Sequence, residues 1–210
     1  MKRPSVEKLV LARMEERGRG SVLTPRDFRD LGSRGAVAVA LHRLVKKEVV
    51  RNIGNGLYFF PELGGMFGES SATPHDIVAA IARRDGIRIR PTLAYAANVT
   101  GLSTQVPTRT AFQTDGRSRT IRLRPTRPGD REQEIILRHS SSRYMKARTD
   151  TNYLVIQGLR AMGSEEVGDR ELANLSSKLP AIAKQELHLD LDIAPVWIAD
   201  IMRRLAAEAP

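Results

Sequence analysis

Hydrophobic and polar positions repeat with a helical period between Ser33 and Lys47. With Leu41 at the centre of the apolar side, the neighbours within about 60° of it, at about 100° per residue, are Val37, Leu44, Val45 and Glu48. The opposite side carries small residues first and basic residues later: Gly35, Ala36, Val39, His42, Arg43, Lys46 and Lys47. Ser33 is a favourable N-cap. The pattern predicts a helix that buries one side and presents a cationic side.

A β-hairpin is predicted directly after this helix. The runs VVRNI and LYFF are rich in strand-forming residues, are joined by Gly-Asn-Gly, and are ended by Pro61. The tip of this hairpin is expected to carry Arg51, Asn52 and Asn55. A capped, basic helix followed by a hairpin is typical of a winged helix-turn-helix, whose helix enters the DNA major groove. The alternative is an ordinary helix and hairpin of a core, with a solvated basic side.

Two earlier helices are predicted in the same segment. Val6, Leu9, Val10 and Met14 recur at helical spacing and indicate a helix over about 5–17. Thr24-Pro25-Arg26-Asp27 is a strong helix start, in which Thr24 caps and Asp27 returns a bond to its amide. Phe28 and Leu31 are expected to face inward, and Gly32 to end this short second helix. A winged helix-turn-helix domain is therefore predicted over residues 1–61.

The rest of the chain is predicted to be a linker, 62–73, and a second domain, 74–210. The linker is rich in glycine and serine and has no period. An α+β core over 74–140 should contain a helix after Thr73, a strand at 87–90, a small-residue helix from Thr92, two strands joined as a hairpin around Asp115-Gly116, and a strand at 134–139. A helical part over 150–208 should contain helices at about 150–162, 169–177, 180–187 and 194–207. The expected fold class is α+β.

The distribution of charge favours a polyanionic partner. The chain has 210 residues and a formal net charge of +10. Residues 1–62 hold 13 basic and 7 acidic side chains, residues 63–150 hold 15 and 8, and residues 151–210 hold 6 and 9. The positive charge therefore belongs to the first two-thirds of the chain. Surplus charge can also serve solubility alone.

Composition also bounds the cellular setting. The chain has no cysteine, which excludes disulfides and thiolate zinc sites. Its first residues, MKRPSVEKLVLARMEERG, place charges inside the apolar run and do not form a signal peptide. No stretch approaches the ~18 apolar residues of a membrane span. A cytoplasmic protein without a membrane segment is expected.

The predicted DNA contacts come from three parts of the first domain. From the second helix they are Thr24 and Arg26, where amides and the helix dipole could hold a phosphate. From the third helix and its cap they are Ser33, Arg34, His42, Arg43 and Lys46, and from the hairpin Arg51, Asn52 and Asn55. His42 could contact a base edge or merely cover the surface.

A second basic surface is predicted on the hairpin around Asp115-Gly116. Its arginines are Arg117, Arg119, Arg122, Arg124 and Arg127. Strand alternation places Thr120, Arg122 and Arg124 on one side and Ile121 and Leu123 on the other. The arginine row could extend a DNA footprint, receive an acidic partner, or be a solvated strand surface.

Motifs of catalysis are not found. The four histidines show no metal-ligand spacing, there is no HExxH, and neither GxxxxGK[ST] nor GxGxxG follows a strand pattern. Glu134-Ile135-Ile136 lacks the lysine of a nuclease Glu-x-Lys motif. The sequence therefore predicts no enzyme, no metal and no cofactor.

The pieces LHRL (41–44), GLYFFP (56–61) and GLSTQVP (101–107) resemble the AbiEi-type antitoxins, in particular a branch with a DUF6088-like layout. The resemblance covers roughly residues 5–140. It implies a transcriptional repressor with an N-terminal winged helix and an antitoxin domain, which binds inverted repeats in its own promoter. It also implies that the repressor counteracts a co-encoded nucleotidyltransferase toxin, AbiEii, in abortive phage infection.

Two other functions stay open at this point. One is a solitary winged-helix regulator without a toxin, and the other is a winged helix that binds proteins, with the acidic C-terminal helices around Trp197 as an interface. The expected partner is double-stranded promoter DNA, bound by a monomer or a weak homodimer.

Overall fold

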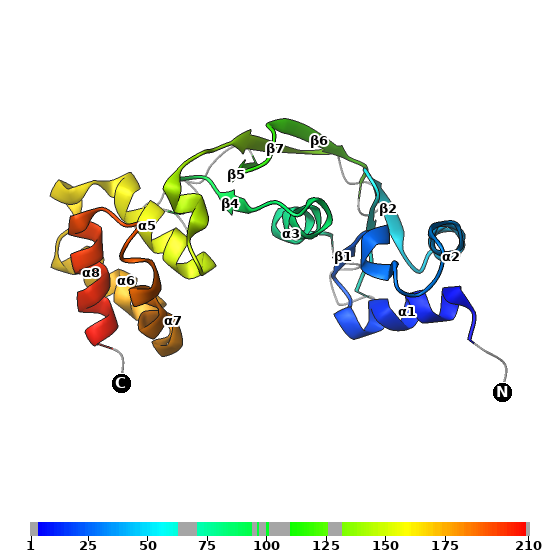
Figure 1. Cartoon of the computed structure of the whole chain (residues 1–210), viewed down its shortest axis with the longest axis horizontal. Helices are drawn as coiled ribbons and strands as arrows, with labels where there is room; N and C mark the ends of the chain where they lie inside the picture. Colours follow the sequence, from blue (N-terminus) through cyan, green and yellow to red (C-terminus); the bar gives the residue numbers. More distant parts are fainter. Residues whose placement is uncertain are drawn as a thin grey trace. The chain divides into compact units, whose positions relative to one another are not determined.

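The computed structural model describes residues 4–62, 71–93, 96, 100, 110–125 and 132–208 (Figure 1). The chain divides into two compact units. The first unit comprises Met1–Ile87 and Arg119–Ile136, and the second comprises Arg88–Ser118 and Leu137–Pro210.

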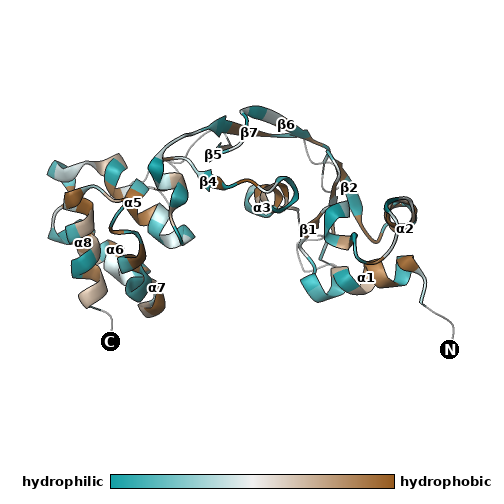
Figure 2. Cartoon of the chain, viewed as in Figure 1, coloured by the Kyte–Doolittle hydropathy of each residue, from teal (hydrophilic) through white to brown (hydrophobic). Residues whose placement is uncertain are grey.

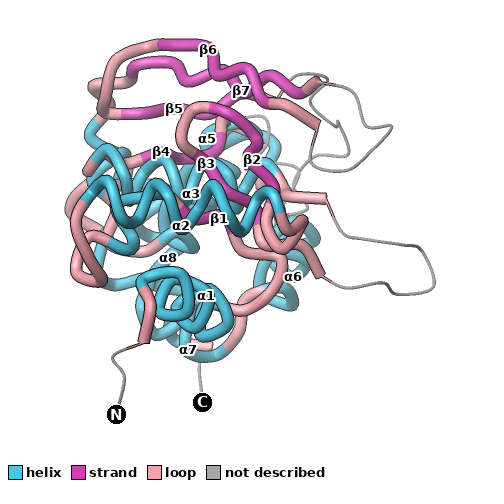
Figure 3. The backbone as a smooth tube through the Cα atoms, turned by 90° about the vertical axis from the view of Figure 1, so that its right-hand side faces the viewer, coloured by secondary structure: helices cyan, strands magenta, loops and turns pink. Residues whose placement is uncertain are grey.

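The first unit begins with helices around a small sheet. Its elements are α1 (Val6–Arg17), β1 (Val22–Leu23), the 3-10 helix η1 (Pro25–Phe28), α2 (Arg34–Lys46), β2 (Arg51–Gly54), β3 (Leu57–Phe59), α3 (Pro74–Asp85) and β6 (Arg119–Leu123). The strands β1, β3 and β2 form an antiparallel sheet in that order, which can be followed in Figure 3. The central strand β3 therefore follows β2 in the chain and pairs on its other edge with the strand before η1.

The core of the first unit lies between α1, α2 and this sheet. Its buried side chains are Val10, Met14, Leu23, Phe28, Val37, Ala40, Leu41, Leu44, Val50 and Phe60. The predicted helices over 5–17 and after Ser33 are confirmed, and Ser5 and Ser33 both cap through their side chains. Burial of a large apolar side chain stabilises the fold by about 1.5–3 kcal/mol, so this stripe fixes which side of α2 faces outward.

Two details of this region differ from expectation. The second helix is a single 3-10 turn of four residues. A 3-10 helix repeats every three residues, which matches the spacing between Phe28 and Leu31 just beyond the turn. Glu48 does not continue the helical stripe, because α2 ends at Lys46 and Glu48 has a left-handed φ of 59°. Its side chain is exposed.

The hairpin after α2 is confirmed. Its turn places Asn55 at φ 52° and Gly56 at φ 68°, the two positive angles that a type I′ turn requires. The strand β1 was not predicted, because two residues are too few to show a strand period. It is held by pairing of Val22 with Phe59 and of Leu23 with Tyr58.

A second sheet has the strand order β4-β5-β7-β6, with β4 (Ile89–Pro91), β5 (Ala111–Thr114) and β7 (Gln133–His139). The predicted hairpin of β5 and β6 is wrong, because β7 lies between them. Hydrogen bonds explain why the turn does not fold back: the Asp115 carboxylate accepts from the Arg88 amide at 2.8 Å, and the His139 Nδ1 lies 2.8 Å from the Gly116 carbonyl oxygen. The expected strand at 134–139 is confirmed.

The division into units differs from the predicted domains 1–61 and 74–210, because α3 and β6 belong to the first unit. Arg83 of α3 donates to the Val22 carbonyl at 3.0 Å and lies 3.7 Å from the Asp27 carboxylate, which ties α3 to β1 and η1. The predicted linker falls mostly on residues outside the described ranges. So do most of the predicted helix from Thr92 and the segment 101–107.

The second unit is mainly helical. Its longer helices are α5 (Asp150–Met162), α6 (Asp169–Lys178), α7 (Ala181–Glu186) and α8 (Val196–Ala207), with 3-10 turns η2 (Arg143–Lys146), η3 (Ser164–Glu166) and η4 (Leu187–Asp190). The predicted helices are confirmed with end shifts of at most two residues. Figure 2 shows that α5 and α8 each contain both hydrophobic and hydrophilic residues. Their buried residues include Val155, Ile156, Leu159, Ile198 and Met202. The fold is α+β, as predicted.

Candidate nucleic-acid interface

One side of α2 is exposed along its whole length. Its exposed residues are Gly35, Val39, His42, Arg43 and Lys46, followed by Lys47 at the C-cap. Arg34 and Ala38 are also exposed but lie nearer the buried stripe of the helix. The Ser33 hydroxyl accepts a hydrogen bond from the Ala36 amide at 3.2 Å and sets where the helix begins. The predicted separation of a buried stripe from a basic outer side is therefore confirmed, except that Ala36 is half-buried.

The basic side chains of α2 and its C-cap fall into two groups. Within the described part of the chain, the side chains of Arg34, His42 and Lys46 make no hydrogen bond or ion pair. Lys47 and Arg43 lie 2.5 Å and 3.8 Å from the two carboxylate oxygens of Glu7 on α1. The Lys47 hydrogen bond, opposed by desolvation and helped by the charges of Lys47 and Arg43, lowers the pKa of Glu7. Arg34, His42 and Lys46 are thus free to meet an anion.

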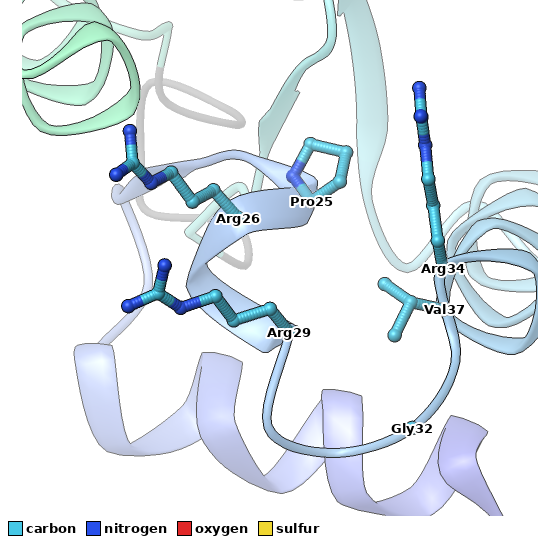
Figure 4. Close-up of a pocket in the computed structure, with 6 residues that line it drawn as sticks. All are labelled: Pro25, Arg26, Arg29, Gly32, Arg34 and Val37. Carbon is cyan, nitrogen blue, oxygen red and sulfur yellow. The ribbon is translucent and has the colours of Figure 1, made fainter.

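A cavity of about 370 Å³ opens beside the start of α2. It is lined by Pro25, Arg26, Arg29, Gly32, Arg34 and Val37. In Figure 4, Arg26 and Arg29 extend in the same direction from η1, while Arg34 projects from α2 on the other side of the pocket. Three arginines therefore line this cavity, with the guanidinium groups of Arg26 and Arg29 pointing away from that of Arg34. Their charge makes the region attractive to a phosphate group.

Thr24 does not belong to this surface, contrary to prediction. Its side chain is buried, and both its amide and its hydroxyl donate to the Asp27 carboxylate, at 2.7 and 2.9 Å. Because the amide and the hydroxyl of Thr24 already donate within this capping box, they are not available to a phosphate. Arg26 is exposed, and its guanidinium donates to the Arg84 carbonyl of α3.

The hairpin residues are more engaged than the sequence suggested. The Asn52 side chain accepts from the Gly54 amide at 2.9 Å and shapes the turn. The Asn55 side chain donates to the Arg122 carbonyl at 2.7 Å, and the Asn55 carbonyl accepts from Arg84 at 2.5 Å. Arg51 is half-buried, at the base of the hairpin rather than at its tip. The exposed tip of the hairpin is thus held in place by hydrogen bonds to other residues of the first unit.

One strand that contacts the hairpin, β6, carries arginines of the second basic surface. The Arg124 amide donates to the Ile53 carbonyl at 2.9 Å, so the end of β6 lies along the outer edge of β2. The Arg124 side chain also lies close to the turn of the hairpin, since a Cβ atom built on Gly54 would be 4.0 Å from the Arg124 Cγ. The predicted alternation is confirmed, since Thr120, Arg122 and Arg124 are exposed while Ile121 and Leu123 are buried. Arg122 and Arg124 therefore extend the surface of the hairpin.

The remaining arginines of that surface have different surroundings. Arg119 forms an ion pair with Asp85, which Arg84 also binds at 2.7 Å. These contacts, the Arg84 hydrogen bond first, lower the pKa of Asp85. Arg122 pairs with Glu134 at 2.9 Å. Arg117 is exposed in the second unit, and Arg127 lies outside the described residues.

Three residues of this region were not predicted as contacts. Arg29 follows Arg26 by three positions, a spacing that a 3-10 turn places on one side and that the sequence could have shown. Val39 was placed on the outer side of the helix but given no role. Arg84 could not have been predicted, because its position depends on where α3 packs.

Other kinds of site find no support in the described part of the chain. It contains no cluster of three or more histidine, aspartate or glutamate side chains that could hold a metal ion. None of its helices has the length and apolar character needed to cross a membrane.

Comparison with known proteins places the chain by family alone. No curated protein and no solved structure matches it. A family model described as "Family of unknown function (DUF6088)" matches residues 9–187, which is most of the chain. The chain therefore belongs to the DUF6088 family, whose function is unknown.

Proposed function

We propose that this protein binds double-stranded DNA through a winged helix-turn-helix formed by α1, η1, α2, β2 and β3, and that it acts as a transcriptional repressor at its own promoter. In this proposal α2 enters the major groove and the hairpin lies against the neighbouring backbone. The observation that carries the proposal is the exposed side of α2, which has small residues near its start and basic residues along it; His42 and Lys46 make no ion pair with the described residues.

The order of the elements supports the winged-helix interpretation. A helix, a short strand, a short second helix, a third helix and a hairpin follow one another, and the sheet order is β1-β3-β2. The first strand thus joins the hairpin and fixes it beside the third helix. The turn between η1 and α2 is short, as a helix-turn-helix requires.

Electrostatics supports DNA over an uncharged partner. Arg29, Arg34, His42 and Lys46 surround the start and outer side of α2, and Arg124 extends the hairpin. Contacts to phosphates position such a protein, while base edges met by the helix specify the sequence. Gly35 and Ala38 leave the backbone of α2 close to whatever it meets, which suits the approach to base pairs.

The antitoxin role stays a prediction from the resemblance. A repressor of this kind would occupy inverted half-sites and exclude polymerase, as a monomer or a weak dimer. Co-expression with a nucleotidyltransferase encoded by a neighbouring gene, followed by co-purification and a growth assay, tests that role.

The DNA-binding proposal is tested by fluorescence anisotropy on a labelled duplex from the region upstream of the gene. The salt dependence of binding is measured for the full-length protein, for Lys46→Gln and for Lys178→Gln. Each phosphate contact contributes about 0.9 to the slope of log K against log salt. We expect Lys46→Gln to reduce the slope by about that amount.

Lys178 provides the matched control, because it is an exposed lysine at the end of α6 in the second unit. Lys178→Gln should leave the slope unchanged. Absence of binding at low salt, or equal slopes for both variants and the unmodified protein, would contradict the proposal for α2.

A further inference from the structure

The outer side of α2 carries an exposed hydrophobic residue among its cations. Val39 is 51% exposed, and it is one of three large hydrophobic side chains, with Ile182 and Val196, that are exposed in the described part of the chain. Nothing in the core requires it, because the buried stripe of α2 is complete with Val37, Ala40, Leu41 and Leu44.

The position of Val39 is central on this side. Gly35 precedes it and Arg43 follows it by one helical turn each, so all three project in nearly the same direction. Lys46 lies two helical turns after Val39 on the same side. The valine is thus flanked by a glycine that allows close approach and by cations that would meet phosphates.

We infer that α2 reads a thymine through Val39, whose methyl groups would contact the 5-methyl group of that base in the major groove. This inference rests on the proposed DNA binding and adds the base that the helix selects. Thymine alone of the four bases presents a methyl group in the major groove, and apolar side chains recognise it by contact. Arg43 and Lys46, which follow Val39 on the same side, would contact the DNA backbone beside that base.

A second copy of this chain is a less suitable occupant of the same surface. Self-association through Val39 would bring Arg43 and Lys46 of one copy toward the same residues of the other, and like charges brought together destabilise an interface. The DNA duplex instead supplies negative charge beside an apolar methyl group.

The test begins with selection of bound duplexes from a random-sequence library by the full-length protein. Each thymine of the selected site is then replaced by deoxyuridine, which differs from thymidine only by the missing methyl group. Affinities are measured for the unmodified protein and for Val39→Ala. Loss of one buried methyl contact corresponds to about a fourfold change in affinity.

We expect one thymine position at which deoxyuridine weakens binding of the unmodified protein about fourfold but leaves binding of Val39→Ala unchanged. Val196→Ala is the matched control, because it makes the same substitution at an exposed valine, 79% accessible, in the second unit. It should keep the full preference for thymine.

The outcomes separate this inference from the proposal beneath it. If the library yields no enriched sequence and binding is absent at low salt, the proposed DNA binding fails. If an enriched sequence is bound but no thymine-to-deoxyuridine change is sensed through Val39, only the inference is overturned. A shift of oligomeric state in Val39→Ala, measured by sedimentation without DNA, would instead assign the valine to self-association and also overturn it.

Discussion

The side-chain amide of Asn55 donates a hydrogen bond of 2.7 Å to the backbone carbonyl of Arg122, which lies 67 residues further along the chain. This bond fixes the tip of the β2–β3 hairpin to β6. A residue that the sequence places at a free tip therefore stays exposed but is tied to β6, and the exposed side chains of Arg122 and Arg124 lie beside it.

Asn55→Gly and Asn55→Ala should separate this hydrogen bond from the backbone conformation. Both variants lose the bond, at a cost of about 1 kcal/mol in the free energy of unfolding. Only alanine adds strain at a φ of 52°, of about 1 kcal/mol more. Urea titration of both variants checks whether Asn55→Ala is destabilised more than Asn55→Gly. Equal losses would mean that the turn relaxes.

Arg124→Ala should weaken DNA binding more than Asn55→Gly does. Arg124 is exposed beside Gly54, whereas the side-chain amide of Asn55 already donates a hydrogen bond to the Arg122 carbonyl. We expect the salt slope of binding to fall by about 0.9 for Arg124→Ala and to stay unchanged for Asn55→Gly. Arg117→Ala in the second unit is the control. A larger loss of DNA affinity for Asn55→Gly than for Arg124→Ala would instead assign the DNA contact to Asn55 at the hairpin tip.

Asp85 should make the first unit sensitive to acid. Its pKa is lowered by Arg84 and then Arg119, so its carboxylate stabilises the folded state at pH values above its ordinary value of 3.8. This contribution is lost as the pH falls below that value toward the folded pKa. Asp85→Asn should therefore lower stability at neutral pH but remove part of the loss between pH 5 and pH 2.

The measurement is the thermal midpoint of both proteins at several pH values in that window, where about pH 5 to pH 2 spans the titration of a stabilised aspartate. Asp200→Asn is a suitable control, because Asp200 is exposed on α8 in the second unit. Parallel curves for Asp85→Asn and the unmodified protein would contradict the assigned role.

Tyr153 should make the second unit sensitive to alkali. Burial raises the pKa of its hydroxyl from 10.0 to about 12, against the opposing charge of Arg90. The hydroxyl donates to the Pro91 carbonyl at 2.8 Å and lies 3.1 Å from the Gln113 side-chain oxygen. Its stabilising contribution is complete below pH 10 and is lost as the pH rises toward 12.

Tyr153→Phe removes this titration together with the hydrogen bond. We expect it to cost about 1 kcal/mol at neutral pH and to lose less further stability between pH 10 and pH 12 than the unmodified protein, as followed by circular dichroism. Tyr58→Phe, at a half-buried position in β3, is the comparison. An unchanged alkaline transition in Tyr153→Phe would place its origin elsewhere.

The sequence alone determined the parts of this protein that depend on neighbouring residues. The apolar stripe of α2, its Ser33 cap, the Gly-Asn-Gly hairpin and the helices after Thr149 are each encoded within about a dozen positions, because caps, turns and helical periods are local. The exposed cations of α2 followed from the same period. So did the burial of Ile121 and Leu123 opposite Arg122.

Tertiary structure decided the contacts between distant segments. The insertion of β7 between β5 and β6, the assignment of α3 to the first unit and the bond from Asn55 to β6 all depend on hydrogen bonds to backbone groups of residues far apart in the chain. Backbone amides and carbonyls are the same in every residue, so a sequence pattern does not specify which strand edge they meet. That pairing is chosen by the packing of the whole unit, and it places Arg122 and Arg124 beside the exposed tip of the hairpin.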